Sequence, residues 1–174
     1  IAALFTAAIE GTIVATAMPT IVTELGGFAL FSWVFAAYML TQAVTIPIYG
    51  RLADLYGRKS IMFIGLGIFL VGSALCGLAK SMVALVVFRA IQGLGAGAIM
   101  PICMTIIGDI YQPIERVRVQ PYLATVFASS SVTGPLAGAF IVNHFGWPLI
   151  FWLNIPICII AAVLIGVFLT ERRV

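Results

Sequence analysis

Charged residues are scarce in this sequence. Asp, Glu, Lys and Arg make up 9% of its 174 residues, against 63% hydrophobic residues and a mean hydropathy of +1.19. A soluble domain is about one-quarter charged, so this chain lacks the polar surface that a water-soluble globular protein needs. Its apolar runs reach about 20 residues, the length of helix that crosses a bilayer core of roughly 30 Å. Because these runs are continuous rather than alternating, the sequence predicts an all-α membrane protein instead of a barrel.

Metal ligands and enzyme motifs are also missing from the sequence. The cysteines Cys76, Cys103 and Cys158 lie in apolar runs without metal-ligand spacing, which favours packing roles over disulfides or ligands. GLGAGA at 93–98 fits a loose dinucleotide-binding pattern, but it lies inside an apolar span and follows no strand. There is no Walker sequence, zinc motif or nucleophile elbow. We therefore predict that the protein is not an enzyme, and that it has no metal, cofactor or nucleic-acid partner.

Hydrophobic runs define six predicted spans with short connections. Their approximate limits are 3–23, 30–50, 60–79, 82–107, 117–142 and 149–169.

Basic residues gather in alternate connections, and cytoplasmic loops are the ones that carry excess Lys and Arg. This rule predicts a multi-pass protein of the plasma or inner membrane with both ends of the chain in the cytoplasm. The residues assigned to the cytoplasmic side are Arg51, Arg58, Lys59, Arg116, Arg118, Arg172 and Arg173, against Lys80 on the other side.

An internal repeat relates the two halves of the chain. IEGTIVATAMP at 9–19 and IQGLGAGAIMP at 91–101 share a frame at an offset of 82 residues, and PIYG at 47–50 is echoed by PLAG at 135–138. Because the copies lie three spans apart, they have opposite orientations in the bilayer. The predicted fold is one six-helix bundle of two inverted three-helix repeats, at about 1–79 and 80–174, a design typical of secondary transporters.

Two charged residues lie well inside predicted spans, Glu10 in the first and Arg89 in the fourth. Such groups are costly in a bilayer and are functional candidates by default. A pair between them would neutralise both charges, and Gln92, one turn from Arg89, is expected in the same cluster. A proton and a cationic substrate that compete for Glu10 would make a minimal antiport cycle. The alternative is a static structural ion pair.

The stretch GRLADLYGRK at 50–59 carries charge between two uncharged runs. Gly50 and Gly57 are expected to permit a tight chain reversal, and Asp54 is suited to cap a helix start or face a helix N-terminus.

Beside Lys59, Arg58 is expected to reach Asp109 at the end of span four, and Glu115 and Arg116 to extend that network. Ordinary positive-inside charge is the alternative explanation, but it does not account for the two glycines and the aspartate.

Four motifs together resemble the major facilitator superfamily. GRLADLYGRK is similar to its signature loop between helices two and three, and LVVFRAIQGLGAG at 85–97 to its fourth-helix motif. SSSVTGPLAGAF resembles the fifth-helix antiporter motif through Gly134, Pro135 and Gly138. EGTIVATAMPTIV resembles the first-helix motif of the fourteen-span drug:proton antiporters. The sequence departs from the pattern at Glu10, where Asp is usual, and at two prolines, Pro121 for Gly and Pro148 for Arg.

The resemblance implies the N-terminal half of a proton-coupled transporter that exports amphipathic or cationic drugs by alternating access. It further implies protons as the coupling ion, the C-terminal half as partner and GRLADLYGRK as a cytoplasmic latch. Gly134 and Gly138 have the spacing of close helix packing, with a kink expected at Pro135. An exporter of a metabolite or siderophore, and a non-transporting membrane component or scaffold, are the alternatives. The predicted substrate-cavity residues are Phe35, Tyr38, Thr41, Gln42, Met100, Phe127 and Ser130.

Overall fold

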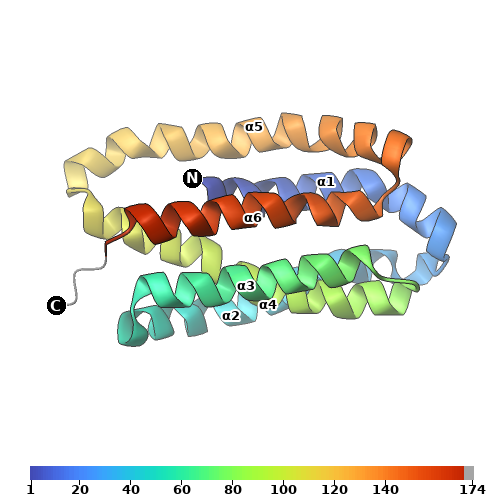
Figure 1. The fold of residues 1–174 in the computed structure, drawn as a ribbon, viewed down its shortest axis with the longest axis horizontal. Coiled ribbons are helices and arrows are strands. Elements are labelled where there is room, and N and C mark those ends of the chain that lie inside the picture. Colours follow the sequence, from blue (N-terminus) through green and yellow to red (C-terminus); the bar gives the residue numbers. More distant parts are fainter. Residues whose placement is uncertain (171–174) are drawn as a thin grey trace.

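The computed structural model describes residues 1–170, and these form helices joined by short turns (Figure 1). All six predicted spans are confirmed as helices long and apolar enough to cross a membrane. The helices are α1 (Ala2–Leu25), η1 (Phe28–Leu30), α2 (Phe31–Tyr56), α3 (Arg58–Gly77), α4 (Met82–Ile110), α5 (Pro113–Phe145) and α6 (Pro148–Phe168).

The packing of the helices follows the inverted repeat. The first helix of each repeat lies between the second and third helices of the other, so α1 packs against α5 and α6 while α4 packs against α2 and α3. The two third helices, α3 and α6, also pack against each other, and α1 contacts α4. Each repeat therefore completes its core with the other repeat, which places α1 and α4 at the centre of the bundle.

Helix ends are set by local sequence. Gly57 has a φ of 94°, a conformation that favours glycine, and it alone separates α2 from α3. Ser81 caps α4 by accepting a hydrogen bond from the backbone N–H of Ala84 at 3.1 Å. Pro148 is in the first turn of α6, where its missing N–H costs no helical hydrogen bond. The departure at Pro148 is thus accommodated by the start of a helix.

Two predicted boundaries were wrong at one end of the bundle. α2 continues six residues past the predicted limit to Tyr56, and α5 begins at Pro113 rather than 117. Gly50 therefore lies within α2 and makes no turn; a Cβ added there would meet nothing within 4 Å. Hydropathy marks the membrane and misses helical turns that extend beyond it. Arg172 and Arg173, used in the charge count, lie outside the described residues.

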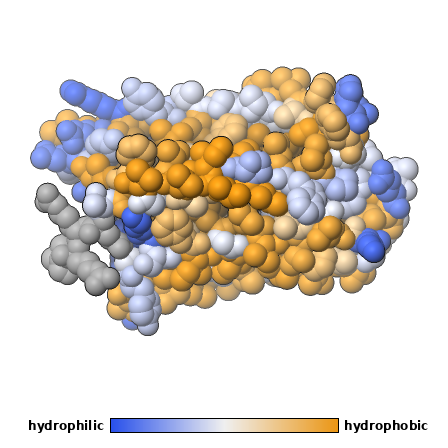
Figure 2. Space-filling view, in the orientation of Figure 1, coloured by the Kyte–Doolittle hydropathy of each residue, from blue (hydrophilic) through white to orange (hydrophobic). Residues whose placement is uncertain are grey.

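Side-chain polarity divides the surface into zones (Figure 2). An apolar band covers the middle of the bundle, and hydrophilic residues gather towards both ends. At one end, on the left in Figure 1, the α2–α3 and α4–α5 connections meet. We call this the basic end; its cations are Arg51, Arg58, Lys59, Arg116 and Arg118.

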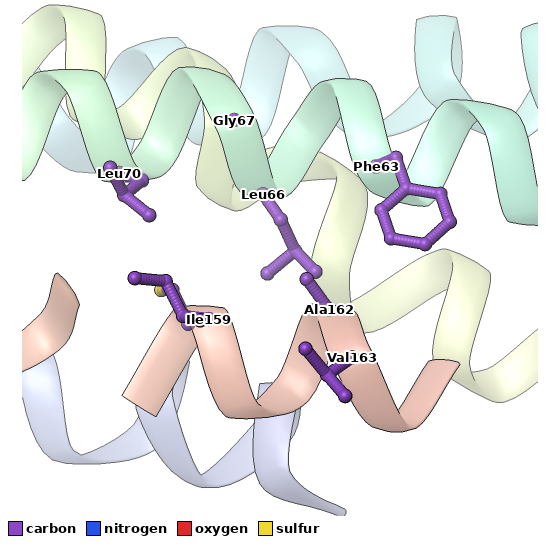
Figure 3. Close-up of a pocket in the computed structure, with 8 residues that line it drawn as sticks. Phe63, Leu66, Gly67, Leu70, Ile159, Ala162 and Val163 are labelled. Carbon is purple, nitrogen blue, oxygen red and sulfur yellow. The ribbon is translucent and has the colours of Figure 1, made fainter. Parts of the chain in front are cut away.

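A pocket lies between α3 and α6 (Figure 3). Phe63, Leu66 and Leu70 line it from α3, and Ile159 and Val163 from α6. This apolar lining offers nothing to bind a charged compound, so the polar chemistry of the bundle has to be sought elsewhere.

Candidate functional site

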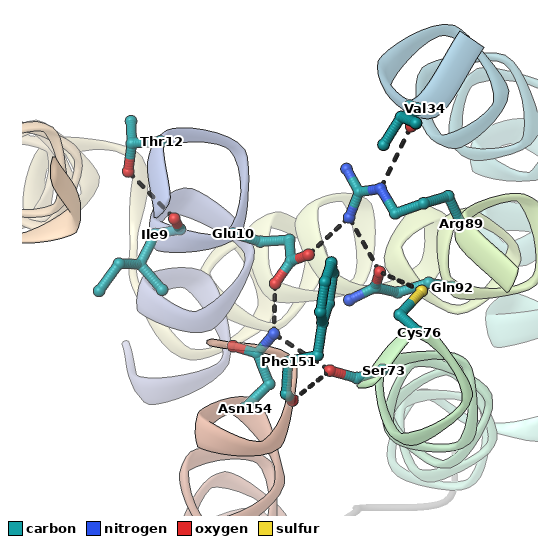
Figure 4. Close-up of polar contacts among 10 residues, drawn as sticks. All are labelled: Ile9, Glu10, Thr12, Val34, Ser73, Cys76, Arg89, Gln92, Phe151 and Asn154. Carbon is teal, nitrogen blue, oxygen red and sulfur yellow. Dashed lines mark hydrogen bonds and ion pairs between the residues drawn. The ribbon is translucent and has the colours of Figure 1, made fainter. Parts of the chain in front are cut away.

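Glu10 and Arg89 form an ion pair in the centre of the bundle (Figure 4). Arg89 Nη1 lies 2.5 Å from Glu10 Oε1, and the two side chains are 1% and 0% exposed. Glu10 comes from α1 and Arg89 from α4, so the pair joins the central helices of the two repeats. A carboxylate and a guanidinium at this depth are expensive to bury, and each offsets the charge of the other.

Arg89 has further partners on α2 and α4. Its Nε donates to the backbone carbonyl of Val34 at 3.2 Å, and Nη1 also donates to Gln92 Oε1 at 2.9 Å. The guanidinium lies 4.1 Å from the centre of the Tyr38 ring, a cation–π contact. Arg89 therefore keeps partners on α2 and α4 that do not depend on Glu10.

The second oxygen of Glu10 has a partner that the sequence analysis missed. Asn154 on α6 donates from Nδ2 to Glu10 Oε2 and, at 3.2 Å, to Ser73 Oγ on α3. Ser73 Oγ donates in turn to the carbonyl of Phe151 at 2.6 Å. The available signal was a lone Asn in the otherwise apolar run FWLNIPICII. We call Glu10, Ser73, Arg89, Gln92 and Asn154 the buried polar cluster.

Two polar atoms next to Arg89 have no hydrogen-bond partner among the described residues. They are the Tyr38 hydroxyl and Gln92 Nε2, and both are buried. Gln92 Oε1, by contrast, accepts from Arg89 and from Cys76 Sγ, the latter at 3.7 Å. Buried polar groups are nearly always paired, so these two atoms are exceptions, and both lie beside the buried ion pair.

Glycines bring the helices of the site close together. A Cβ on Gly93 would overlap the Tyr38 carbonyl and the Thr41 hydroxyl on α2. A Cβ on Gly134 would overlap the Thr12 side chain on α1. The second glycine of each pair makes the same contact, since Gly97 also lies against α2 and Gly138 also lies against α1. The small-xxx-small spacings therefore mark the α2–α4 and α1–α5 contacts. Pro135 lies within α5, which continues through it and through Pro121.

The basic end contains the expected ion pair between Arg58 and Asp109, which joins α3 to α4. Asp54 lies in the last turns of α2, where its carboxylate is 3.9 Å from Arg58, so it does not cap a helix start. Lys59 donates to the carbonyls of Gly166 and Leu169 at 2.8 and 2.9 Å, and thereby binds the end of α6.

Glu115 and Arg116 serve the α4–α5 connection instead of extending this pair. Glu115 accepts from the backbone N–H of Gln112 at 3.0 Å in a capping box that starts α5. Arg116 donates to the carbonyls of Tyr111 and Gly108, the first at 3.0 Å. The expected network is thus divided into two local groups.

The predicted cavity residues are scattered in their exposure. Tyr38 and Ser130 are buried, and Phe127 is exposed. Tyr38 contacts Arg89, whereas Ser130 donates to the carbonyl of Val126 within its own helix at 2.7 Å. The remaining four residues, Phe35, Thr41, Gln42 and Met100, are partly buried. A common cavity lined by all seven stays a prediction. Within residues 1–170 there is no group of three His, Cys, Asp or Glu side chains placed to hold a metal ion.

Inverted repeats of membrane-spanning helices are a recurring design of secondary transporters. The family model of the Major Facilitator Superfamily matches residues 1–174. The chain therefore belongs to this superfamily, whose members are transporters rather than enzymes.

Comparison with individual proteins agrees with this assignment. Multidrug resistance protein 3 of Bacillus subtilis (strain 168) is 50% identical over 150 residues, which cover 86% of this chain and 29% of that protein. Multidrug transporter protein MdtP of the same organism is 43% identical over 173 residues, covering 99% and 32%. The chain thus spans about 30% of these relatives. The crystal structure of the human organic anion transporter MFSD10 shares the fold, with a TM-score of 0.80 at 18% identity over 98% of this chain and 46% of that one.

Proposed function

We propose that the chain is the N-terminal half of a proton-coupled exporter of amphipathic or cationic compounds in the cell membrane, with Glu10 as the group that binds the coupled proton. The observation that carries the proposal is the burial of Glu10 against Arg89 at the junction of the two repeats. The names of the two Bacillus subtilis relatives support multidrug export as the activity. The C-terminal half of the same transporter and the lipid bilayer are the proposed partners.

The ion pair supplies a mechanism for exchange. When a proton binds Glu10, the carboxylate loses its charge and with it most of its attraction for Arg89. Arg89 then keeps Val34, Gln92 and Tyr38 as partners, so its charge remains solvated by the protein. A cationic substrate that favours ionised Glu10 promotes release of the proton. Two ligands that compete for one carboxylate are thereby coupled.

The basic end is proposed to be cytoplasmic, because Lys and Arg concentrate there. The loop GRLADLYGRK, held against α4 by the Arg58–Asp109 pair, would then latch the two halves on the cytoplasmic side when the transporter faces outward. A static role for the ion pair remains the competing explanation, and it predicts that removing the charge of Glu10 affects stability alone.

The test is drug-dependent proton movement in vesicles that contain the full-length transporter, comparing wild type with Glu10→Gln. We expect drug addition to release protons from the wild type and not from the variant, because Gln cannot bind and release a proton. Glu115→Gln is the matched control, since Gln can still fill the capping position outside the buried polar cluster. If Glu10→Gln exchanges drug for protons like the wild type, the coupling carboxylate lies elsewhere and Glu10 is a structural partner of Arg89.

A further inference from the structure

Asn154 binds Glu10 on the side opposite Arg89. Arg89 contacts Oε1, whereas Asn154 Nδ2 donates to Oε2, so the two oxygens of one carboxylate have different partners (Figure 4). Asn154 is 1% exposed and comes from α6, the helix that packs against both α1 and α3. The two oxygens of Glu10 are therefore not equivalent as places for a proton.

The hydrogen-bond chain fixes which way the Asn154 amide faces. The single hydroxyl hydrogen of Ser73 is used in the bond to the Phe151 carbonyl, so Ser73 Oγ can only accept from Asn154. The amide must then turn its NH₂ group towards Ser73, and the second hydrogen of that group points at Glu10 Oε2. A flipped amide would place its carbonyl oxygen against both Ser73 Oγ and the carboxylate, with no hydrogen between them.

We propose that Asn154 is a positioning residue for proton coupling, holding Oε2 of Glu10 as an acceptor so that the proton binds at Oε1, the oxygen that contacts Arg89. The inference rests on the proposed function of Glu10 as the proton-binding group. Each oxygen faces a donor, so a proton on either one displaces it. A proton on Oε1 displaces Arg89, which keeps Val34, Gln92 and Tyr38 as partners, whereas a proton on Oε2 would leave one N–H of Asn154 without its acceptor. Proton binding and the ion pair then exclude each other at one atom.

Proton binding at Oε1 changes the charge of the site by one unit. One proton from water adds to Oε1 without breaking a covalent bond, and Arg89 stays protonated, so the Glu10–Arg89 pair changes from neutral to a single positive charge. The other titratable groups near Glu10 are Tyr38 on α2, Cys76 on α3 and Cys158 on α6, all of them buried and neutral. α5 faces this part of α1 with the Ser130 carbonyl, which accepts from Thr12.

Asn154→Leu tests the proposal through the pH profile of drug-dependent proton exchange by the full-length transporter in vesicles. Leu has a similar volume and no donor, so the carboxylate of Glu10 loses a hydrogen bond that stabilises it. We expect the pH of half-maximal exchange to rise by about one unit, the size expected for one hydrogen bond to a charged group. Asn143→Leu, the same change at an exposed position on α5, is expected to leave the profile unchanged.

Ser73→Ala provides a second, smaller perturbation that leaves Asn154 in place. It removes the acceptor that orients the amide, and we expect a shift in the same direction by less than for Asn154→Leu. Asn154→Gln retains an amide and is expected to lie closer to the wild type. If Asn154→Leu does not fold, the Ser73→Ala profile decides alone.

Failure of this inference is distinguishable from failure of the proposed function. If both variants exchange drug for protons with the wild-type profile while Glu10→Gln is inactive, the role of Asn154 is overturned and Glu10 remains the coupling group. If Glu10→Gln exchanges normally, both proposals are overturned together.

Discussion

At the scale of single residues, Arg89 is the residue that links the buried polar cluster to three helices. Its guanidinium donates to a carboxylate, an amide oxygen and a backbone carbonyl on three different helices. A lysine has a compact charge on a flexible stem and cannot reproduce this fork, so an Arg-to-Lys change here is not conservative. Because the pair is fully buried, losing one member leaves a buried charge without its counter-charge, whereas losing both members leaves no charge behind.

The variant Arg89→Gln is predicted to destabilise the bundle by about 3–5 kcal/mol, because it leaves the Glu10 carboxylate buried without its counter-charge. The double variant Glu10→Gln/Arg89→Gln is predicted to be clearly more stable than Arg89→Gln, since no charge is left uncompensated. Thermal unfolding of the purified transporters in detergent measures the difference. A double variant as unstable as Arg89→Gln would mean that the arginine acts through its packing rather than through its charge.

How far sequence predicts such a site depends on the kind of residue. Glu10 and Arg89 were predicted because a charge within an apolar run is costly and conspicuous. Asn154 was missed because an uncharged polar residue in a span also fits a purely structural role in helix packing. Only the fold brings it within reach of Glu10, 144 positions away in the sequence. The hydrogen bonds of Ser73 depend on the α3–α6 contact and are equally invisible in the sequence.

At the scale of helices, close approach is set by glycines that face a neighbouring backbone. Gly95 on α4 is the clearest example, because a Cβ there would overlap the backbone of both Gly65 and Phe69 on α3. Backbone atoms cannot rotate away as a flexible side chain can. Gly67 on α3 is different, since a Cβ there would meet nothing within 4 Å.

The substitution Gly95→Ala is accordingly predicted to cost about 1–3 kcal/mol, the usual penalty for overpacking a core. Gly67→Ala is the matched control and is predicted to be neutral or to stabilise α3 by about 0.5–1 kcal/mol, because alanine loses less entropy in a helix. Unfolding of the two purified variants under identical conditions compares them. Equal stabilities would show that the α3–α4 contact tolerates a wider separation than the structure has.

The spacing of these glycines could be recognised from the sequence, but their partners could not. Small-xxx-small patterns indicate that a helix packs closely, and they do not name the neighbour. The ends of α2 and α5 were misplaced for a related reason. Those helical turns carry charged residues, Arg51 and Asp54 in α2 and Glu115 and Arg116 in α5, so the uncharged run ends although the helix continues.

At the scale of the whole molecule, the Arg58–Asp109 pair can bias a conformational equilibrium without holding the fold together. Its side chains are 28% and 48% exposed, and ion pairs of this kind contribute roughly 0.2–1 kcal/mol. Such an energy is small beside the stability of a bundle. It is nevertheless enough to change the ratio of two nearly balanced states by up to about fivefold.

Charge reversal is predicted to separate an effect on the conformational equilibrium from an effect on the stability of the fold. Arg58→Asp should lower transport by the full-length protein while changing its unfolding temperature little, because two carboxylates would then face and repel each other across the α3–α4 contact. Adding Asp109→Arg should restore much of the activity by re-forming the pair with opposite polarity. Transport in vesicles and thermal unfolding are measured on the same preparations. Loss of stability in Arg58→Asp without rescue by the double variant would contradict a role in switching.

The interleaving of the two repeats also has a consequence for the order in which the protein is made. Arg89 follows Glu10 by 79 residues, which at roughly 5–20 residues per second means that about 4–16 s separate their synthesis. During this interval Glu10 has no Arg89 to pair with, and Asn154 is synthesised later still. An uncharged carboxyl group enters an apolar environment at lower cost than a carboxylate. The proton binding proposed for Glu10 would thus also lower the cost of inserting α1, and the ion pair would form once the second repeat has been made.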